Sequence, residues 1–208
     1  MFLDLAIALA ALALALFFRP WRILARAPAL VSPTLAILVV LPWLWALPAL
    51  HRAPLQLRWS GAVLVLLMLG WPLAVPVLLL VAAIAWAISP LAAAGALTAA
   101  VWQGIVPATL AVLLGAALRR WLPPHPFVYV LGRGFLGALL CLFAAGLLAQ
   151  AASAPLPGVP GELDRVARWL MAWSDAIVTG MLTAIFVAFK PEWLLTWSDK
   201  RYLDRPPQ

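Results

Sequence analysis

Long apolar runs alternate with short polar or basic connections along the whole chain. The runs cover approximately residues 2–18, 30–50, 60–88, 91–118, 126–152 and 168–190. A helix needs about 20 mostly apolar residues to cross the hydrocarbon core of a bilayer, and most of these runs reach that length. The pattern predicts an all-α integral membrane bundle, with residues 1–190 forming one transmembrane domain.

The run at 60–88 is interrupted by Gly70-Trp71-Pro72. Proline removes a backbone donor and glycine tolerates a sharp turn, so this tripeptide favours a hairpin between two short helices. A hairpin also keeps the connections at 51–59 and 89–90 on the same side of the membrane. We therefore predict about seven transmembrane segments, the third and fourth of them short.

The basic residues indicate the orientation of the chain. Cytoplasmic connections of membrane proteins carry an excess of Lys and Arg. Counting favours a topology with the N-terminus outside and the C-terminus in the cytoplasm, in the inner (cytoplasmic) membrane of a bacterium. The cations then placed inside are Arg19, Arg22, Arg26, Arg119, Arg120, Lys190, Lys200, Arg201 and Arg205.

Composition supports this interpretation and narrows the chemistry. Only 10% of the 208 residues are charged and 66% are hydrophobic, which a soluble surface of this size does not allow. The net charge of +7 comes from cations at the ends of apolar runs, so we expect lipid headgroups and not nucleic acid as partners. No phosphate-binding loop or other catalytic motif is present, and Cys141 is the single cysteine. We expect no enzyme activity, no cofactor and no metal.

Ionisable residues inside apolar runs or at their start are the candidate functional residues, because their burial is costly in a membrane. Asp4, Arg58 and Asp175 are all predicted near the outer face, and Gln103 lies close to Pro107 in the next span. One interpretation is a ligand site beneath an outward-facing cavity. The other is a structural ion pair between Arg58 and one of the carboxylates.

Arg133 lies between two glycines in the run at 126–152. We expect its long side chain to reach back to the cytoplasmic interface, with a role in transport as the alternative.

The segment 191–208 alternates aromatic and charged residues, among them Trp193, Trp197 and Tyr202. This pattern is typical of an interfacial tail on the cytoplasmic leaflet. These aromatic side chains either form a belt at the headgroups or provide a surface for another subunit.

Three stretches resemble a bacterial family of energy-coupling-factor transporter permeases. They are LRWSGAVLVLLMLGWPLAV (57–75), LPPHPFVYVLGRGFLGALL (122–140) and WSDAIVTGMLTAIFVAFKPEWLLTWSDKRYL (173–203), roughly a third of the chain. That family is similar to the substrate-capture subunit of cobalt and nickel importers. The resemblance implies seven helices, an outer N-terminus, and separate scaffold and ATPase subunits as partners.

The chain departs from the metal-binding relatives at their ligands. Phe2 and Arg58 stand where those relatives carry histidine, and Asp175 stands where the family usually has glutamate. A cation at position 58 repels a metal ion, so the resemblance implies a substrate-capture-like subunit whose metal ligands are lost. If a substrate exists, Arg58 favours one with an anionic group. The alternative is a non-transporting accessory subunit of a larger membrane complex.

Overall fold

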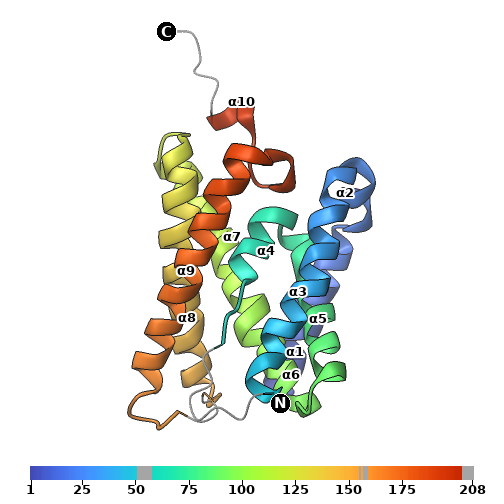
Figure 1. Ribbon diagram of the computed structural model, residues 1–208, viewed down its shortest axis with the longest axis vertical. Helices are drawn as coiled ribbons and strands as arrows, with labels where there is room; N and C mark the ends of the chain where they lie inside the picture. The colour runs from blue at the N-terminus through green and yellow to red at the C-terminus, as the bar shows by residue number, and fades with distance from the viewer. Residues whose placement is uncertain (51–57, 155, 157–158, 203–208) are drawn as a thin grey trace.

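The computed structural model describes residues 1–50, 58–154, 156 and 159–202. Most of the predicted connection at 51–59 and residues 203–208 of the predicted tail lie outside the described residues. Every element in the described ranges is helical (Figure 1). The α-helices are α1 (Phe2–Phe17), α2 (Trp21–Arg26), α3 (Val31–Leu50), α4 (Ala62–Leu69), α5 (Trp71–Ile88), α6 (Ala93–Ala99), α7 (Val106–Trp121), α8 (Gly137–Ala151), α9 (Asp164–Phe189) and α10 (Asp199–Tyr202).

Irregular helical turns extend several of these helices. Two π-helical stretches, η2 (Ala100–Ile105) and η3 (Val128–Leu136), lead directly into α7 and α8. Two 3-10 turns, η1 (Pro28–Leu30) and η4 (Pro191–Trp193), come before α3 and after α9. Six helices among the described residues are long and apolar enough to cross a membrane. By length and composition the chain is therefore an all-helical, multi-pass membrane protein, as predicted.

The eight-residue helix α4 lies among the long helices (Figure 1) and differs from all of them. It is about 12 Å long at the α-helical rise, too short to cross a bilayer. All eight of its side chains are buried, as expected for a helix that is apolar on every face. Gly61 (φ 65°) precedes it and Gly70 (φ 70°) ends it, so glycine permits the change of direction at both ends. The interruption at Gly70 thus separates α4 from α5.

The segment after α9 folds back onto the end of α4. The backbone N–H groups of Leu195 and Thr196 donate to the carbonyls of Met68 (2.9 Å) and Leu67 (3.3 Å), and the Thr196 hydroxyl also donates to Leu67 (2.8 Å). Carbonyls at a helix end have no partner within the helix. Because α4 ends inside the protein, water does not reach these carbonyls. Leu195 and Thr196 provide the hydrogen-bond donors that water would otherwise supply.

This packing differs from the predicted interfacial segment. Trp197 and Tyr202 are buried, and their rings contact the ring of fully buried Tyr129 at 4.9 and 5.3 Å between centroids. Two of the three predicted partner-interface residues therefore pack inside their own chain, since Tyr129 provides an aromatic surface that the sequence pattern does not reveal. Trp193 is half-buried, against Phe186 of α9.

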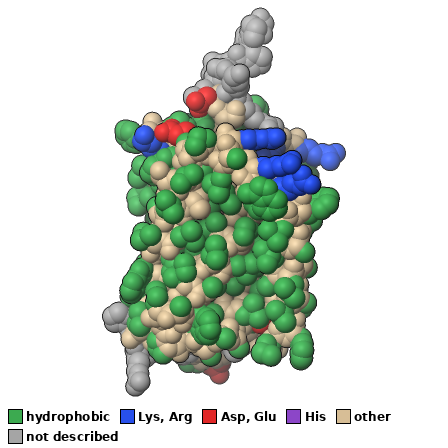
Figure 2. Space-filling model, turned by 90° about the vertical axis from the view of Figure 1, so that its right-hand side faces the viewer, with side chains coloured by type: hydrophobic (Ala, Val, Ile, Leu, Met, Phe, Trp, Pro, Cys, Tyr) green, Lys and Arg blue, Asp and Glu red, His purple; other side chains and the backbone are tan. Residues whose placement is uncertain are grey.

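The two ends of the bundle differ in charge. Figure 2 shows apolar side chains over the side of the molecule and Lys and Arg gathered at one end, where Figure 1 places α2. The exposed arginines Arg22 and Arg26 belong to α2. The N-terminus and α10 lie at opposite ends (Figure 1). Such a belt with charged ends is the surface expected of a protein surrounded by lipid.

Candidate functional site

Asp175 lies in α9 and is only 2% exposed. Its Oδ2 accepts hydrogen bonds from the backbone N–H groups of Ser60 (2.7 Å) and Gly61 (3.0 Å), and its Oδ1 accepts one from the Thr179 hydroxyl (3.1 Å). The carboxylate thus lies at the start of α4, where backbone donors and the positive end of the helix dipole favour negative charge. Asp175 joins two segments that are 115 residues apart.

Ser60 connects the same point to two more elements. Its hydroxyl donates to the backbone carbonyl of Gln103 in η2 and accepts from the N–H of Ala62 (3.1 Å). The indole N–H of Trp45 in α3 donates to the Ser60 carbonyl (3.1 Å). The extended segment before α4 is therefore held on three sides by hydrogen bonds, as backbone at membrane depth requires.

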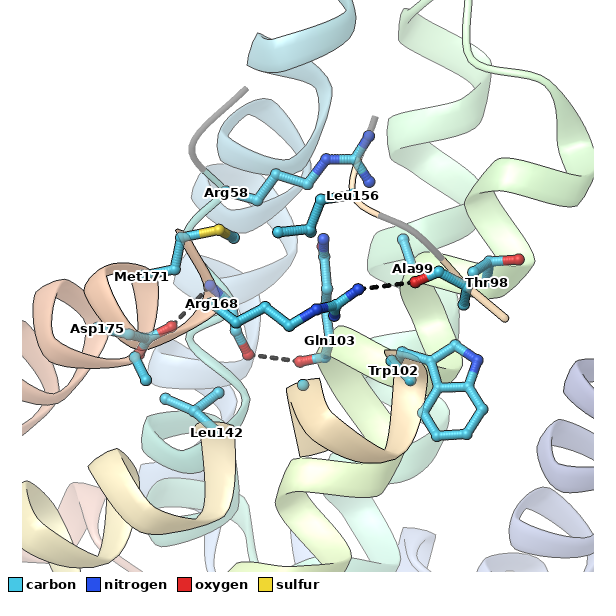
Figure 3. A pocket seen from close by; sticks show the side chains of 15 residues that line it. Arg58, Thr98, Ala99, Trp102, Gln103, Leu142, Leu156, Arg168, Met171 and Asp175 are labelled. Carbon is cyan, nitrogen blue, oxygen red and sulfur yellow. Dashed lines mark hydrogen bonds between the residues drawn. The ribbon is translucent and has the colours of Figure 1, made fainter. Parts of the chain in front are cut away.

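A cavity of about 90 Å³ lies beside this network. It is formed by the segment before α4, by α6 and η2, by α8, by Ala154 and Leu156, and by α9. Figure 3 shows that several polar side chains line it, from elements far apart in the sequence: Arg58, Thr98, Gln103, Arg168 and Asp175. The volume accommodates several water molecules or a small organic ion. The π-helical turn in η2 that carries Gln103 is a feature often found at functional sites.

Arg168 enters the cavity from the first turns of α9 and carries a buried ion pair. Its Nε donates to Oδ2 of Asp164 (2.6 Å), and its Nη2 donates to the carbonyl of Ala154 (2.8 Å). Oδ1 of Asp164 accepts from the N–H of Leu156 (3.1 Å). The pair thereby holds residues 154 and 156 at the edge of the cavity.

Arg58 adds a second guanidinium to the cavity wall. Arginine keeps its positive charge at neutral pH even when its side chain is buried. The wall therefore combines two cationic side chains with the carboxylate of Asp175. A cavity of this kind can bind a small molecule through an anionic group.

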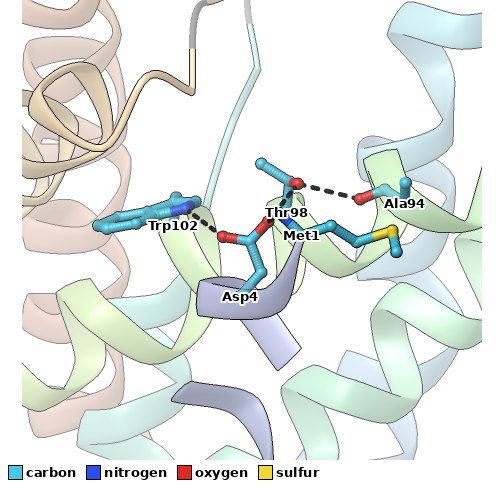
Figure 4. Close-up of polar contacts among 5 residues, drawn as sticks. All are labelled: Met1, Asp4, Ala94, Thr98 and Trp102. Atoms are coloured by element: carbon cyan, nitrogen blue, oxygen red, sulfur yellow. Dashed lines mark hydrogen bonds and ion pairs between the residues drawn. The ribbon is translucent and has the colours of Figure 1, made fainter. Parts of the chain in front are cut away.

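Asp4 forms a separate cluster next to the cavity (Figure 4). Its carboxylate accepts hydrogen bonds from the Trp102 indole (2.9 Å) and the Thr98 hydroxyl (2.9 Å), and the N-terminal amine lies 3.6 Å away. Thr98 and Trp102 also line the cavity, but Asp4 does not. Asp4 therefore contacts two residues of the cavity wall, Thr98 and Trp102, without lining the cavity itself.

The sequence singled out three of these residues, and the structure brings them to one cavity: Arg58, Gln103 and Asp175. It did not single out Arg168 or Asp164, because α9 begins at Asp164 and not at the predicted residue 168. The four-residue spacing of Asp164 and Arg168 on one helix was the signal available for this pair. A buried ion pair does lie near this cavity, but it joins Asp164 and Arg168, neither of which belongs to the predicted pair.

Arg133 is also placed differently from the prediction. It is 5% exposed and its guanidinium lies over the Tyr129 ring, 5.3 Å from the centroid. The side chain does not extend to the surface, because Gly115 of α7 leaves room for it inside the bundle.

Within the described ranges, no group of three or more His, Cys, Asp or Glu side chains is arranged to hold a metal ion. Comparisons with protein-family models, with curated proteins and with solved structures give no match. The function proposed for this chain therefore depends on its own geometry and on the resemblance described above.

Proposed function

We propose that this chain is a ligand-binding membrane subunit of an importer, similar in role to the substrate-capture subunits of energy-coupling-factor transporters and without ATPase activity of its own. The observation that carries the proposal is the single cavity shared by Arg58, Arg168 and Asp175. Ionisable residues in membrane segments are costly and mark substrate pathways. The cavity also adjoins the start of the broken helix α4, and interrupted helices are where transporters bind their substrates.

The orientation follows from the charges. The N-terminus lies outside and the C-terminus in the bacterial cytoplasm, because the cationic end then faces inward. In this topology α4 is a third, short segment that forms a hairpin with α5. Helix α6 and the first turns of α9, which line the cavity, lie toward the end that carries the N-terminus (Figure 1), so the ligand enters from the outer side.

The side chains favour a small ligand with a carboxylate or a similar anionic group. Guanidinium groups bind such groups through paired hydrogen bonds. Among the described residues, Asp175 accepts three hydrogen bonds, from Ser60, Gly61 and Thr179. Asp175 therefore positions the segment that carries Arg58, and the arginines bind the ligand.

Equilibrium binding of radiolabelled acetate, lactate and succinate to the purified protein tests this proposal. We expect at least one of them to bind, and Arg58→Ala to weaken that binding by roughly tenfold or more, since a charge-assisted hydrogen bond contributes about 1.5–3 kcal/mol. Arg22→Ala removes an exposed arginine of α2 and should bind as the wild type does. Absence of binding to the wild type, or equal binding by Arg58→Ala, contradicts the proposal.

A second candidate function is an accessory subunit of a larger membrane complex. The small cavity and the internal partners of Arg168 and Asp175 favour it. Purification in mild detergent followed by mass spectrometry of the copurifying proteins separates the two. A scaffold protein with nucleotide-binding subunits supports import, whereas an unrelated respiratory or photosynthetic assembly supports the accessory role.

A further inference from the structure

A buried arginine lies toward the opposite end of the bundle from the cavity. Arg133 belongs to η3 and lines a second, smaller pocket of about 30 Å³, near the C-terminal end of α7. Three kinds of side chain complete the pocket: the cation Arg119, the aromatic Tyr202, and the apolar residues Leu118, Leu122, Pro123, Pro124 and Val128.

The guanidinium of Arg133 has unused hydrogen-bonding capacity. Its Nε and Nη1 atoms are buried and, among the described residues, have no hydrogen-bond acceptor. The described ion pairs of the chain involve other residues. A buried charge without acceptors is unfavourable, and arginine cannot escape this by losing its proton. An anion at this position would supply the missing acceptors.

The surrounding backbone is shaped around this cation. A Cβ at Gly115 would lie 2.8 Å from Nη2 and 2.9 Å from Nε of Arg133. Any other residue at position 115 would therefore displace the guanidinium from the position that it occupies here. The Tyr129 ring packs against the same group through a cation–π contact. The guanidinium of Arg133 is thus placed by Gly115 of α7 and by Tyr129 of its own element η3.

The pocket also adjoins an exposed apolar surface. Leu122 lines it and is exposed, as are Trp121 and Phe127 on either side of the turn between α7 and η3. Paired arginines at the basic end of a membrane protein, next to exposed apolar side chains, match a phosphate group that carries acyl chains. We propose that Arg133, with Arg119, binds a phosphate group, supplied by a phospholipid headgroup or by free phosphate.

Native mass spectrometry and thermal unfolding of the purified full-length protein test this site. The additives are phosphatidylglycerol, diacylglycerol with the same acyl chains, and inorganic phosphate. We expect phosphatidylglycerol to be retained and to raise the unfolding temperature, and diacylglycerol to do neither. If inorganic phosphate raises the unfolding temperature and displaces the lipid, the site is a phosphate site that also accepts the free ion.

Three variants connect the effect to Arg133. Arg133→Gln should reduce retained phosphatidylglycerol roughly tenfold, because it removes the charge-assisted bonds. Gly115→Ala should reduce it too, by displacing the guanidinium. Arg120→Gln removes an exposed arginine of the same helix that does not line the pocket and should retain as much lipid as the wild type.

Two results would overturn the assignment. One is a wild type that neither phosphatidylglycerol nor phosphate stabilises more than diacylglycerol does, a measurement that requires no variant to fold. The other is equal lipid retention by the wild type and Arg133→Gln. Neither result bears on binding at Arg58, because the two pockets share no residue.

Discussion

Replacing Asp175 should destabilise the bundle by disconnecting α4 from α9. In Asp175→Ala the backbone N–H groups of Ser60 and Gly61 lose their acceptor, and the Thr179 hydroxyl loses one as well. Leaving a buried donor unsatisfied costs about 1–3 kcal/mol, and two backbone donors are affected. Water from the adjoining cavity offsets part of this, so we expect a loss of about 2–4 kcal/mol.

Asp175→Asn is the matched variant. It retains one oxygen that can accept from both backbone donors. It loses the charge, and its NH2 group now faces the Thr179 hydroxyl, which can accept a hydrogen bond in place of donating one. The difference between a charged and a neutral hydrogen bond predicts a loss of about 1 kcal/mol. Unfolding of the purified protein by SDS titration, followed by tryptophan fluorescence, measures both variants against the wild type.

The order of the three proteins decides whether the reasoning holds. Wild type should be the most stable, Asp175→Asn intermediate and Asp175→Ala the least stable. If the alanine variant is as stable as the wild type, the carboxylate does not hold α4. If both variants lose the same amount, charge alone matters and the loss of acceptors for the two backbone donors does not.

Two further predictions use the same unfolding assay. Asp164→Asn leaves the buried Arg168 cation without its counter-ion and should cost about 3 kcal/mol, whereas Glu192→Gln breaks an exposed pair and should change stability by less than about 0.5 kcal/mol; equal effects would refute this. Gly70→Ala should cost about 1–3 kcal/mol, because φ is 70° and the new Cβ would lie 2.8 Å from a side-chain atom. The control is Gly95→Ala in α6, where the nearest atom to the new Cβ is 3.8 Å away, so this variant should be as stable as the wild type or more stable. Similar losses of stability in Gly70→Ala and Gly95→Ala would contradict the argument from the backbone conformation of Gly70.

The sequence by itself determined the class of this protein. Apolar length is a local property of the chain, so the long runs predicted the membrane helices without any knowledge of their neighbours. Gly70 and Pro72 likewise predicted where the run at 60–88 divides. The conformational freedom of glycine and the fixed φ of proline are local properties that depend on no distant contact. The cost of charge inside a membrane was enough to single out Asp175 as a candidate, together with Arg58 at the start of the third predicted span.

The tertiary structure decided which of those residues meet. The Ser60–Asp175 hydrogen bond joins α9 to the start of α4, and α4 ends against the segment after α9. Neither contact leaves a periodic signal, because each depends on how helices pack across the bundle. The same packing left the Nε and Nη1 atoms of Arg133 without a hydrogen-bond acceptor among the described residues. Hydrophobicity is read along one segment, whereas a polar contact in lipid needs two segments, and only the folded bundle brings them together.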